Sequence, residues 1–260
     1  MANIALRAAR NAADYIAQAF DRPDERDIQS KAHNDFVSDV DIKAERMIID
    51  AIRQTYPLHA ILAEESDAIE TDSEFTWIID PLDGTLNFLQ CIPHFAVSIA
   101  VKKGNHIEHG VIVDPMRNEE WVASRGHGAQ LNGKRIRVSQ RSKLQDCVLG
   151  TGIPPGSMDN LDYYMKTLHE FTRNCRGVRR GGSAALDLAY VAAGRTDGFW
   201  EMGLSKWDIA AGIVMVREAG GFLVDWEGGE SYWQTGDIVA ANPKCMRAMV
   251  QTLRAAKAIS

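Results

Sequence analysis

The chain has 260 residues, which is long enough for one large domain or two small ones with a sizeable hydrophobic core. Its apolar content of 45% and charged content of 25% are ordinary for a globular protein, and its net charge of −6 disfavours non-specific binding to nucleic acid. The four cysteines form no CxxC pair and no apolar run reaches membrane-spanning length, so we expect a cytoplasmic protein without a zinc site, a disulfide scaffold or a membrane partner.

Two helices are predicted at the start of the chain. Apolar residues recur every four positions over residues 4–20, which indicates an amphipathic helix. A polar loop over 31–35 leads to a second helix, which is expected to have Asp39 or Asp41 at its N-cap and to stop near Pro57. Its inner face is expected to carry Ile42, Ile48, Ile49 and Ile52.

Consecutive antiparallel strands are predicted between about residues 60 and 140, beneath these two helices. Runs of apolar and β-branched residues place strands at 60–63, 75–79, 95–101, 107–113, 121–123 and 136–138. Lys103-Gly104-Asn105 and Asn132-Gly133 are turn sequences that indicate hairpins.

Beyond about residue 145 the pattern changes to alternating strands and helices, which suggests a second, α/β layer. Strands are predicted at 147–150, 196–201, 222–225 and 238–240. Helices are predicted at 158–174, at 184–193 with Ser183 as N-cap, from Trp207 to the glycines at 220–221, and from Pro243 onward. We therefore divide the chain into residues 1–145, with a helical pair and an antiparallel sheet, and residues 146–260, an α/β subdomain.

One stretch, residues 75–88, carries the densest chemical signal. An apolar strand runs directly into Asp80, Pro81 is expected to end the sheet ladder because it has no N–H group, and Asp83-Gly84 is expected to form a tight turn. Two carboxylates this close repel each other unless a cation lies between them. An ordinary turn after a strand is the alternative interpretation.

Other acidic residues follow or begin apolar elements in the same way. Glu64, with Glu65, follows a predicted strand, and Asp208 begins a predicted helix. A solvated charge pair and a helix N-cap are the respective alternatives. Sites in α/β folds lie at such strand ends and helix starts, and clustered carboxylates without Cys or His favour Mg²⁺. A site of this kind suits phosphate ester hydrolysis, in which metal ions activate water and neutralise charge.

Three segments together resemble the signatures of the inositol monophosphatase family. They are Glu64-Glu65-Ser66, Asp80-Pro81-Leu82-Asp83-Gly84-Thr85-Leu86-Asn87-Phe88 and Trp207-Asp208-Ile209-Ala210-Ala211-Gly212, in the family's order and at similar spacings. Residues 31–41, 182–185 and 201–203 resemble further family segments. The likeness covers nearly the whole chain and is closest to the bacterial SuhB-type branch.

This resemblance implies a layered αβαβα sandwich of the inositol monophosphatase and sugar phosphatase type, an α+β or α/β fold. It implies Mg²⁺-dependent hydrolysis of myo-inositol-1-phosphate to myo-inositol and phosphate, without a phosphoenzyme and with two or three Mg²⁺ ions. Lithium sensitivity and a homodimer are further implications, and the substrate would be a small phosphorylated polyol.

The resemblance also assigns roles to individual residues. Glu64, Asp80 and the Leu82 carbonyl would hold one metal ion, and Asp80, Asp83 and Asp208 a second. Glu64 would orient the attacking water together with Thr85, which Asp41 would polarise. The residues expected to lie against the substrate are Asp83, Gly84, Thr85, Arg179, Ala184, Glu201 and Asp208, with Glu201 on a ring hydroxyl and Arg179 near the substrate or a subunit interface.

Two rival functions remain to be weighed. A haloacid-dehalogenase phosphatase also contains Asp-Gly-Thr, but it needs a nucleophilic Asp where this chain has Pro81. The second rival is a regulatory protein on the same fold that binds RNA or a transcription complex, with or without phosphatase activity. Its surface would be the basic residues Lys134, Arg135, Arg137, Arg141, Lys143, Arg176, Arg179 and Arg180, for which a solvated surface is the alternative.

Overall fold

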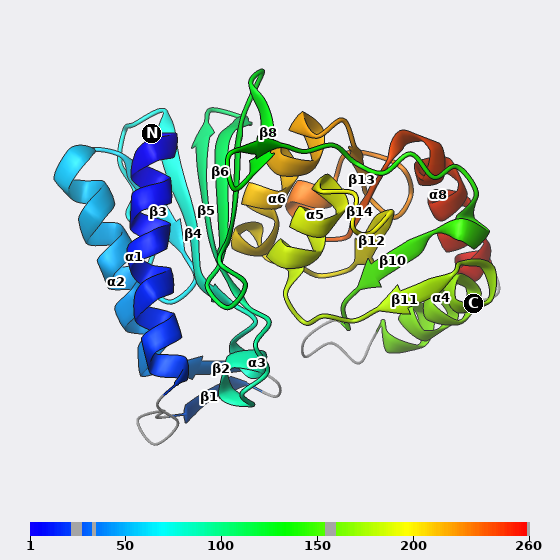
Figure 1. Cartoon of the computed structure of the whole chain (residues 1–260), viewed down its shortest axis with the longest axis horizontal. Helices are drawn as coiled ribbons and strands as arrows, with labels where there is room; N and C mark the ends of the chain where they lie inside the picture. Colours follow the sequence, from blue (N-terminus) through cyan, green and yellow to red (C-terminus); the bar gives the residue numbers. More distant parts are fainter. Residues whose placement is uncertain (22–27, 33–34, 154–159, 259–260) are drawn as a thin grey trace.

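The computed structural model describes residues 1–21, 28–32, 35–153 and 160–258. Helices and sheets alternate in five layers (Figure 1). Helices α1 (Ala2–Phe20) and α2 (Asp39–Thr55) cover one sheet, α5 (Ala184–Ala192) and α6 (Lys206–Glu218) lie between this sheet and a second one, and α4 (Leu161–Asn174) and α8 (Pro243–Ala258) cover the far face. The predicted layered αβαβα fold is confirmed.

The first two helices bury the faces that their apolar spacing indicates, with one exception. In α1 the buried residues are Ala5, Ala8, Ala9, Ala12, Ala13 and Ile16. In α2 both Ile48 and Ile52 are fully buried, but Ile42 is 47% exposed, so its prediction as an inner-face residue was wrong. The buried stripe of α2 instead begins with Val40 and Ala44, one turn apart. Asp39 and Asp41 both lie inside the first turn rather than before it.

Residues 28–32 and 35–38 form a two-stranded ribbon, whereas a polar loop was predicted over 31–35. Strand β1 (Ile28–Ala32) pairs antiparallel with β2 (Asp35–Ser38), and residues 33–34 lie outside the described residues. Composition misled the prediction for residues 31, 32 and 35: the polar residues were weighed above the strand-forming Ile28, Phe36 and Val37.

The first sheet has seven strands in sequence order. They are β3 (Ala60–Ala63), β4 (Phe75–Asp83), β5 (Ala96–Lys103), β6 (His106–Asp114), β7 (Glu119–Ser124), β8 (Gly128–Leu131) and β9 (Lys134–Arg135). Only the β3–β4 pair is parallel. Asn132 and Gly133 have φ values of 48° and 74°, which confirms the predicted hairpin turn.

The strand predicted at 136–138 is absent, and a short element precedes it instead. Strand β9 ends at Arg135, and the chain then leaves the sheet to cross to the second one (Figure 1). Val138 consequently donates its backbone N–H to the carbonyl of Ala219, at the end of α6, rather than to a neighbouring strand. Ile136 still donates its N–H to the Ala129 carbonyl of β8, whereas Val138 is buried in the core that contains α6.

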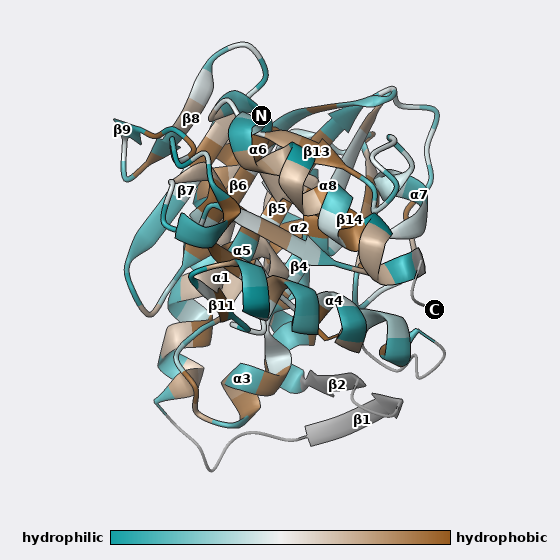
Figure 2. Ribbon diagram, turned by 90° about the vertical axis from the view of Figure 1, so that its right-hand side faces the viewer, coloured by the Kyte–Doolittle hydropathy of each residue, from teal (hydrophilic) through white to brown (hydrophobic). Residues whose placement is uncertain are grey.

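The second sheet has five strands in the order β11-β10-β12-β14-β13. They are β10 (Val148–Thr151), β11 (Gly177–Arg179), β12 (Gly198–Glu201), β13 (Phe222–Val224) and β14 (Ile238–Ala241). The short elements β11, η2 (Leu144–Asp146) and α7 (Tyr232–Thr235) were not predicted. Residues 158–159, the predicted start of a helix, lie outside the described residues, and α4 begins at Leu161. Figure 2 shows α4 and α8 over this sheet.

The core between the two sheets depends on close approach of backbones. A Cβ on Gly110 of β6 would lie 2.6 Å from Val214 of α6, and one on Gly212 would lie 2.3 Å from Leu188 of α5. The missing side chains let α6 sit tightly against both neighbours, which positions its N-terminus. Since α5 and α6 share this core with the first sheet, the division near residue 145 stays a prediction. Within the described ranges, no helix is both long and apolar enough to span a membrane.

Candidate active site

The site begins with an irregularity in β4. The prediction that Pro81 ends the strand was wrong: β4 continues to Asp83, and its pairing with β5 shifts between Asp80, opposite Ser98, and Asp83, opposite Ala96. The irregularity accommodates the missing N–H of Pro81, as bulges do at the edges of active sites. The Asp80 carboxylate accepts a hydrogen bond from the Leu82 N–H, at 3.0 Å.

Glu64 lies beside Asp80 because β3 and β4 run parallel. Ala63 pairs with Ile79, so the next residue of each strand is an acid. Asp80 is buried, with 1% of its surface exposed. Burial first, and then the charges of Glu64, Asp83 and Asp208, hold the pKa of Asp80 well above its usual range, with a side-chain hydrogen bond to Glu64 adding to the effect. Of the four acids predicted to meet, three are therefore close enough to Asp80 to oppose its ionisation.

The N-terminus of α5 holds Asp83. Gly84 turns the chain with φ 102°, as predicted for this position. The Ser183 hydroxyl donates to Asp83 Oδ2 at 2.5 Å, and the Ala185 N–H donates to the same oxygen at 2.7 Å. Ser183 is the predicted N-cap of α5. Burial raises the pKa of Asp83 to about 6, against the opposing effect of these hydrogen bonds.

The N-terminus of α6 holds Asp208 in a similar way. Asp208 lies in the first turn and its Oδ2 accepts the Ser205 N–H at 2.7 Å, so it is a capping-box residue rather than the N-cap. Burial, followed by the charge of Asp83, holds the pKa of Asp208 well above its usual range. The hydroxyl of Ser98, opposite Asp80, donates to the Trp207 carbonyl at 3.5 Å. This contact ties the start of α6 to the first sheet.

Side chains of helix α2 contact the residues that follow the parallel strands β3 and β4. The Thr85 hydroxyl, at the start of α3 (Thr85–Leu89), lies 3.0 Å from Asp41 Oδ1 and 3.1 Å from the Leu82 carbonyl, and donates to one of them at a time. One turn along α2, Glu45 accepts the Glu65 N–H at 2.8 Å. Asp41 and Glu45 are both buried, so one face of α2 positions two parts of the site.

Glu201 lies at the end of β12, where the charges of Asp187 and Arg180 act on it. The sequence did not predict this effect of either residue. Glu201 is buried, and a Cβ on Gly152 would lie 2.0 Å from its Oε1. Burial, and then the charges of Asp187 and Asp83, raise the pKa of Glu201 well above its usual range, while the charge of Arg180 opposes the rise. Asp187 is the lone acid within the apolar helix α5, and that isolation was a signal for it.

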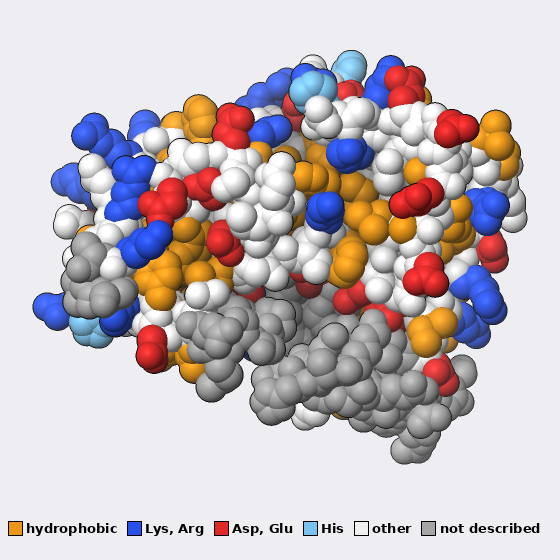
Figure 3. Space-filling view, turned by 180° about the vertical axis from the view of Figure 1, so that it is seen from behind, with side chains coloured by type: hydrophobic (Ala, Val, Ile, Leu, Met, Phe, Trp, Pro, Cys, Tyr) orange, Lys and Arg blue, Asp and Glu red, His pale blue; other side chains and the backbone are white. Residues whose placement is uncertain are grey.

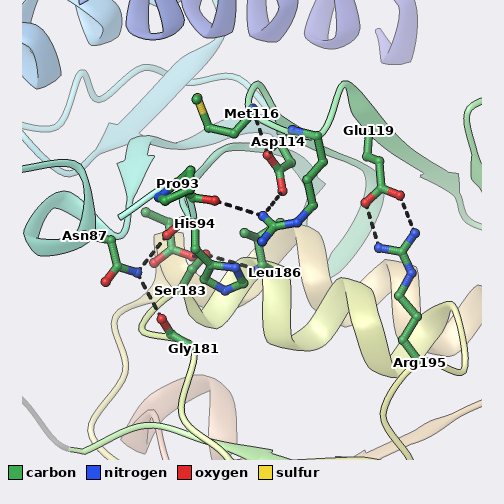
Figure 4. Close-up of polar contacts among 12 residues, drawn as sticks. Asn87, Pro93, His94, Asp114, Met116, Glu119, Gly181, Ser183, Leu186 and Arg195 are labelled. Atoms are coloured by element: carbon green, nitrogen blue, oxygen red, sulfur yellow. Dashed lines mark hydrogen bonds and ion pairs between the residues drawn. The ribbon is translucent and has the colours of Figure 1, made fainter. Parts of the chain in front are cut away.

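The segment before α5 borders a cavity of about 490 Å³. It is lined by His94, Val148, Arg179, Arg180, Gly181, Asp187, Tyr190, Arg195 and Thr196. Arg179 is exposed and donates to the Val178 carbonyl at 3.0 Å. Asn87 donates to the carbonyls of His94, at 2.7 Å, and Gly181, at 3.0 Å (Figure 4). Asn87 thereby ties α3 to the segment that leads to Ser183 and Ala184.

The carboxylates fit a hard cation in the chemistry of their donors, which are all oxygen atoms. Among the described residues, no three His, Cys, Asp or Glu side chains already converge as a complete ligand set. The Oδ2 atoms of Asp83 and Asp208 instead face the first turns of α5 and α6. Yet Asp80 is buried among three other acids whose charges oppose its ionisation, and a divalent cation would relieve this repulsion.

Comparisons with known proteins agree on one family. The model of the inositol monophosphatase family matches residues 1–258. The chain is 51% identical over 255 residues to the Nus factor SuhB of Escherichia coli K12, covering 98% of this chain and 96% of that protein. It is similar to the crystal structure of the extragenic suppressor protein suhB from Bartonella henselae, with 44% identity, a TM-score of 0.94, and coverage of 96% of this chain and 97% of that one. It is also similar to the inositol monophosphatase from Anabaena, with 35% identity, a TM-score of 0.84, and coverage of 97% and 94%.

Proposed function

The chain belongs to the inositol monophosphatase family, and on this premise we propose that it hydrolyses inositol monophosphate with Mg²⁺. The family is of the phosphatase type and generally metal-dependent. The observation that carries the proposal is the burial of Asp80 beside Glu64, Asp83 and Asp208. Buried acids that raise one another's pKa are costly for a fold, and such clusters concentrate at functional sites.

The metal ligands follow from this cluster. Glu64, Asp80 and the Leu82 carbonyl would hold one Mg²⁺, and Asp80, Asp83 and Asp208 another, with a third ion as a further possibility. When bound, these ions supply positive charge for the phosphate oxygens and acidity for a water molecule. The preference for Mg²⁺ rests on the all-oxygen donor set.

The remaining roles belong to residues of the chain itself. The Glu64 carboxylate would accept a proton from the attacking water, and the Thr85 hydroxyl, beside Asp41, would orient that water. The backbone N–H groups of residues 83–85 and of Ala184, at the N-terminus of α5, would bind the phosphate oxygens.

Specificity would come from the second sheet. Glu201 would accept a hydrogen bond from a ring hydroxyl, a contact that is charge-assisted only if the group is ionised. Arg180 favours that state, since its charge opposes the rise in the pKa of Glu201. Arg179 would lie at the rim of the substrate site or at a subunit interface. We also propose that the active form is a homodimer and that lithium inhibits it.

The test is phosphate release from myo-inositol-1-phosphate at millimolar Mg²⁺. We expect activity in the wild type and a loss of at least about 100-fold in Asp83→Asn, because the variant loses a negative ligand but keeps a side chain of the same shape. Asp50→Asn, an exposed acid of α2, is the matched control and should retain full activity. Absence of phosphate release by the wild type from any inositol monophosphate would refute the assignment.

A second candidate function rests on the names of close relatives. The similar protein from Escherichia coli is called a Nus factor, which supports a partner in a transcription complex or an RNA partner for this chain as well. All eight residues of the predicted basic set are exposed. Figure 3 shows basic side chains along the top and at both sides of the face seen from behind. The eight residues are therefore available to a partner at exposed positions although the chain has a net charge of −6.

A further inference from the structure

Two cysteines that are 98 residues apart in the sequence meet inside the second half of the molecule. Cys147 directly precedes β10, and Cys245 lies in the first turn of α8. Their sulfur atoms are 2.9 Å apart, although both are present as thiols. Both residues are fully buried in the core between β10, β14, α4 and α8. The proposed phosphatase chemistry uses neither of them.

The two sulfur atoms are close enough for a disulfide bond to form with a small movement. A disulfide bond has a sulfur–sulfur distance of about 2.05 Å, so an approach of less than about 1 Å would complete the bond. Both sulfurs are also held by backbone: Cys147 Sγ lies 3.2 Å from the Lys143 carbonyl, and Cys245 Sγ lies 3.2 Å from the Arg141 carbonyl. These contacts fix the two thiols face to face.

The surroundings of the two thiols differ in a way that favours one of them as the nucleophile. Cys245 lies in the first turn of α8, where the N–H groups of Lys244 and Cys245 donate to Asn242 Oδ1 and the positive end of the helix dipole favours negative charge. Its hydrogen bond with Cys147 lowers the pKa of Cys245, against the effect of burial. The same hydrogen bond, together with burial, raises the pKa of Cys147. We therefore assign Cys245, at the helix start, as the attacking sulfur and Cys147 as the resolving thiol.

We infer that Cys147 and Cys245 form an intramolecular disulfide bond when the protein meets a peroxide. The Cys245 thiolate attacks hydrogen peroxide, breaks its O–O bond and becomes a sulfenic acid, with release of hydroxide. The Cys147 thiol then attacks this sulfur, and its proton leaves with the displaced hydroxyl group as water. In total, two thiols and one peroxide give one disulfide and two waters.

The bond would constrain the second sheet and both helices that hold the acids. The closed loop runs from β10 to α8 and contains α5 and α6. A cross-link over a loop this long restricts the unfolded chain, so it stabilises the folded state. For a chain of this size we expect the melting temperature to rise by about 5–10 °C, reversibly with dithiothreitol.

The experiment treats the full-length protein with hydrogen peroxide and maps its peptides by mass spectrometry without reduction. We expect a linked peptide pair that contains Cys147 and Cys245, with the loss of two hydrogens, and the rise in melting temperature. Cys147→Ser and Cys245→Ser should lose both effects. Cys175→Ser, which removes a half-buried thiol of the same core, should keep them.

The peptide map of the wild type decides the matter even if a serine variant folds poorly. Recovery of Cys147 and Cys245 as unlinked thiols, or as separate sulfinic acids, would overturn the inference. So would a cross-link that joins either of them to Cys91 or Cys175.

Discussion

The acids of this site are buried close to one another, and this burial raises the pKa of individual carboxyl groups. Asp80, Asp83 and Asp208 all have a pKa above the usual range, and burial is the first cause in each case. Helix starts at α5 and α6 offset part of the cost by donating to Asp83 and Asp208. The rest of the cost remains in the metal-free protein, and a bound cation would remove it.

This cost predicts how stability depends on pH. A carboxyl whose folded pKa is raised contributes stability that is present at low pH and is lost as the pH rises through the folded value, which is about 6 for Asp83. We therefore expect the metal-free protein to melt several degrees higher at about pH 5.5 than at about pH 7.5, measured by calorimetry. Mg²⁺ should raise the melting temperature more at the higher pH, where Asp83 is already ionised and no proton has to leave before the cation binds.

The matched comparison for this pH dependence is Asp83→Asn. Its side chain is neutral at every pH, so the variant should show a smaller difference between the two pH values and a smaller effect of Mg²⁺. If the melting temperatures of the wild type and the variant change in parallel with pH, the raised pKa of Asp83 does not govern stability in this range.

At the level of the elements, the sequence predicted the position of the acids better than the shape of the strand that carries them. Glu64 and Asp80 follow apolar runs, and strand register brings such ends together, so their meeting could be foreseen. The continuation of β4 through Pro81 could not, because a bulge depends on the neighbouring strand.

Most of the contacts that the sequence failed to predict join elements that are distant along the chain. Asp187 and Arg180 influence Glu201 only because α5 packs beside β12, and no spacing along the chain reports that packing. The same holds for Cys147 and Cys245, whose separation in sequence argued against a pair. Tertiary packing, rather than local propensity, decides such contacts.

The contact between the ends of β10 and β12 allows the proposed role of Glu201 to be tested without removing it. A Cβ at residue 152 would lie 2.0 Å from Glu201 Oε1, so Gly152→Ala must displace the carboxylate. We expect KM for myo-inositol-1-phosphate to rise roughly tenfold, the loss of one hydrogen bond to a charged group. Turnover of p-nitrophenyl phosphate, which has no ring hydroxyl, should be unchanged.

The control for this substitution is Gly177→Ala in β11, where an added Cβ meets only the end of the Arg179 side chain, at 3.3 Å. It should leave KM for both substrates unchanged. Equal losses on the two substrates in Gly152→Ala would show that residue 152 matters for the phosphate site and not for recognition of the ring.

For the whole molecule, the site is a product of both halves of the chain. The first sheet supplies Glu64, Asp80 and Asp83, while α5 and α6 supply Ser183 and Asp208. A boundary near residue 145 therefore cuts through the site. The segment between β9 and η2 crosses from the first sheet to the second (Figure 1), and its residues Arg137, Arg141 and Lys143 are exposed. The proposed hydrolytic site and this basic segment thus occupy different parts of one fold, although Arg179 and Arg180 of the basic set line the cavity beside the site.

This separation predicts that the two proposed functions can be removed independently. Lys134 and Arg135 are both exposed on β9, at the edge of the first sheet and away from the acid cluster in the strand order. In Lys134→Glu/Arg135→Glu we expect hydrolysis of myo-inositol-1-phosphate to be unchanged. Binding to single-stranded RNA should weaken, with the slope of log affinity against log salt smaller by about 1–2, because two contacts to phosphates are lost.

The reciprocal variant and a matched control complete the test. Asp83→Asn should lose hydrolysis and keep the RNA affinity of the wild type. Arg46→Glu, a charge reversal at an exposed position of α2, should leave both measurements unchanged. Equal weakening of RNA binding in Arg46→Glu and in the β9 variant would assign the effect to total charge, since a surface specific to β9 predicts a difference between them.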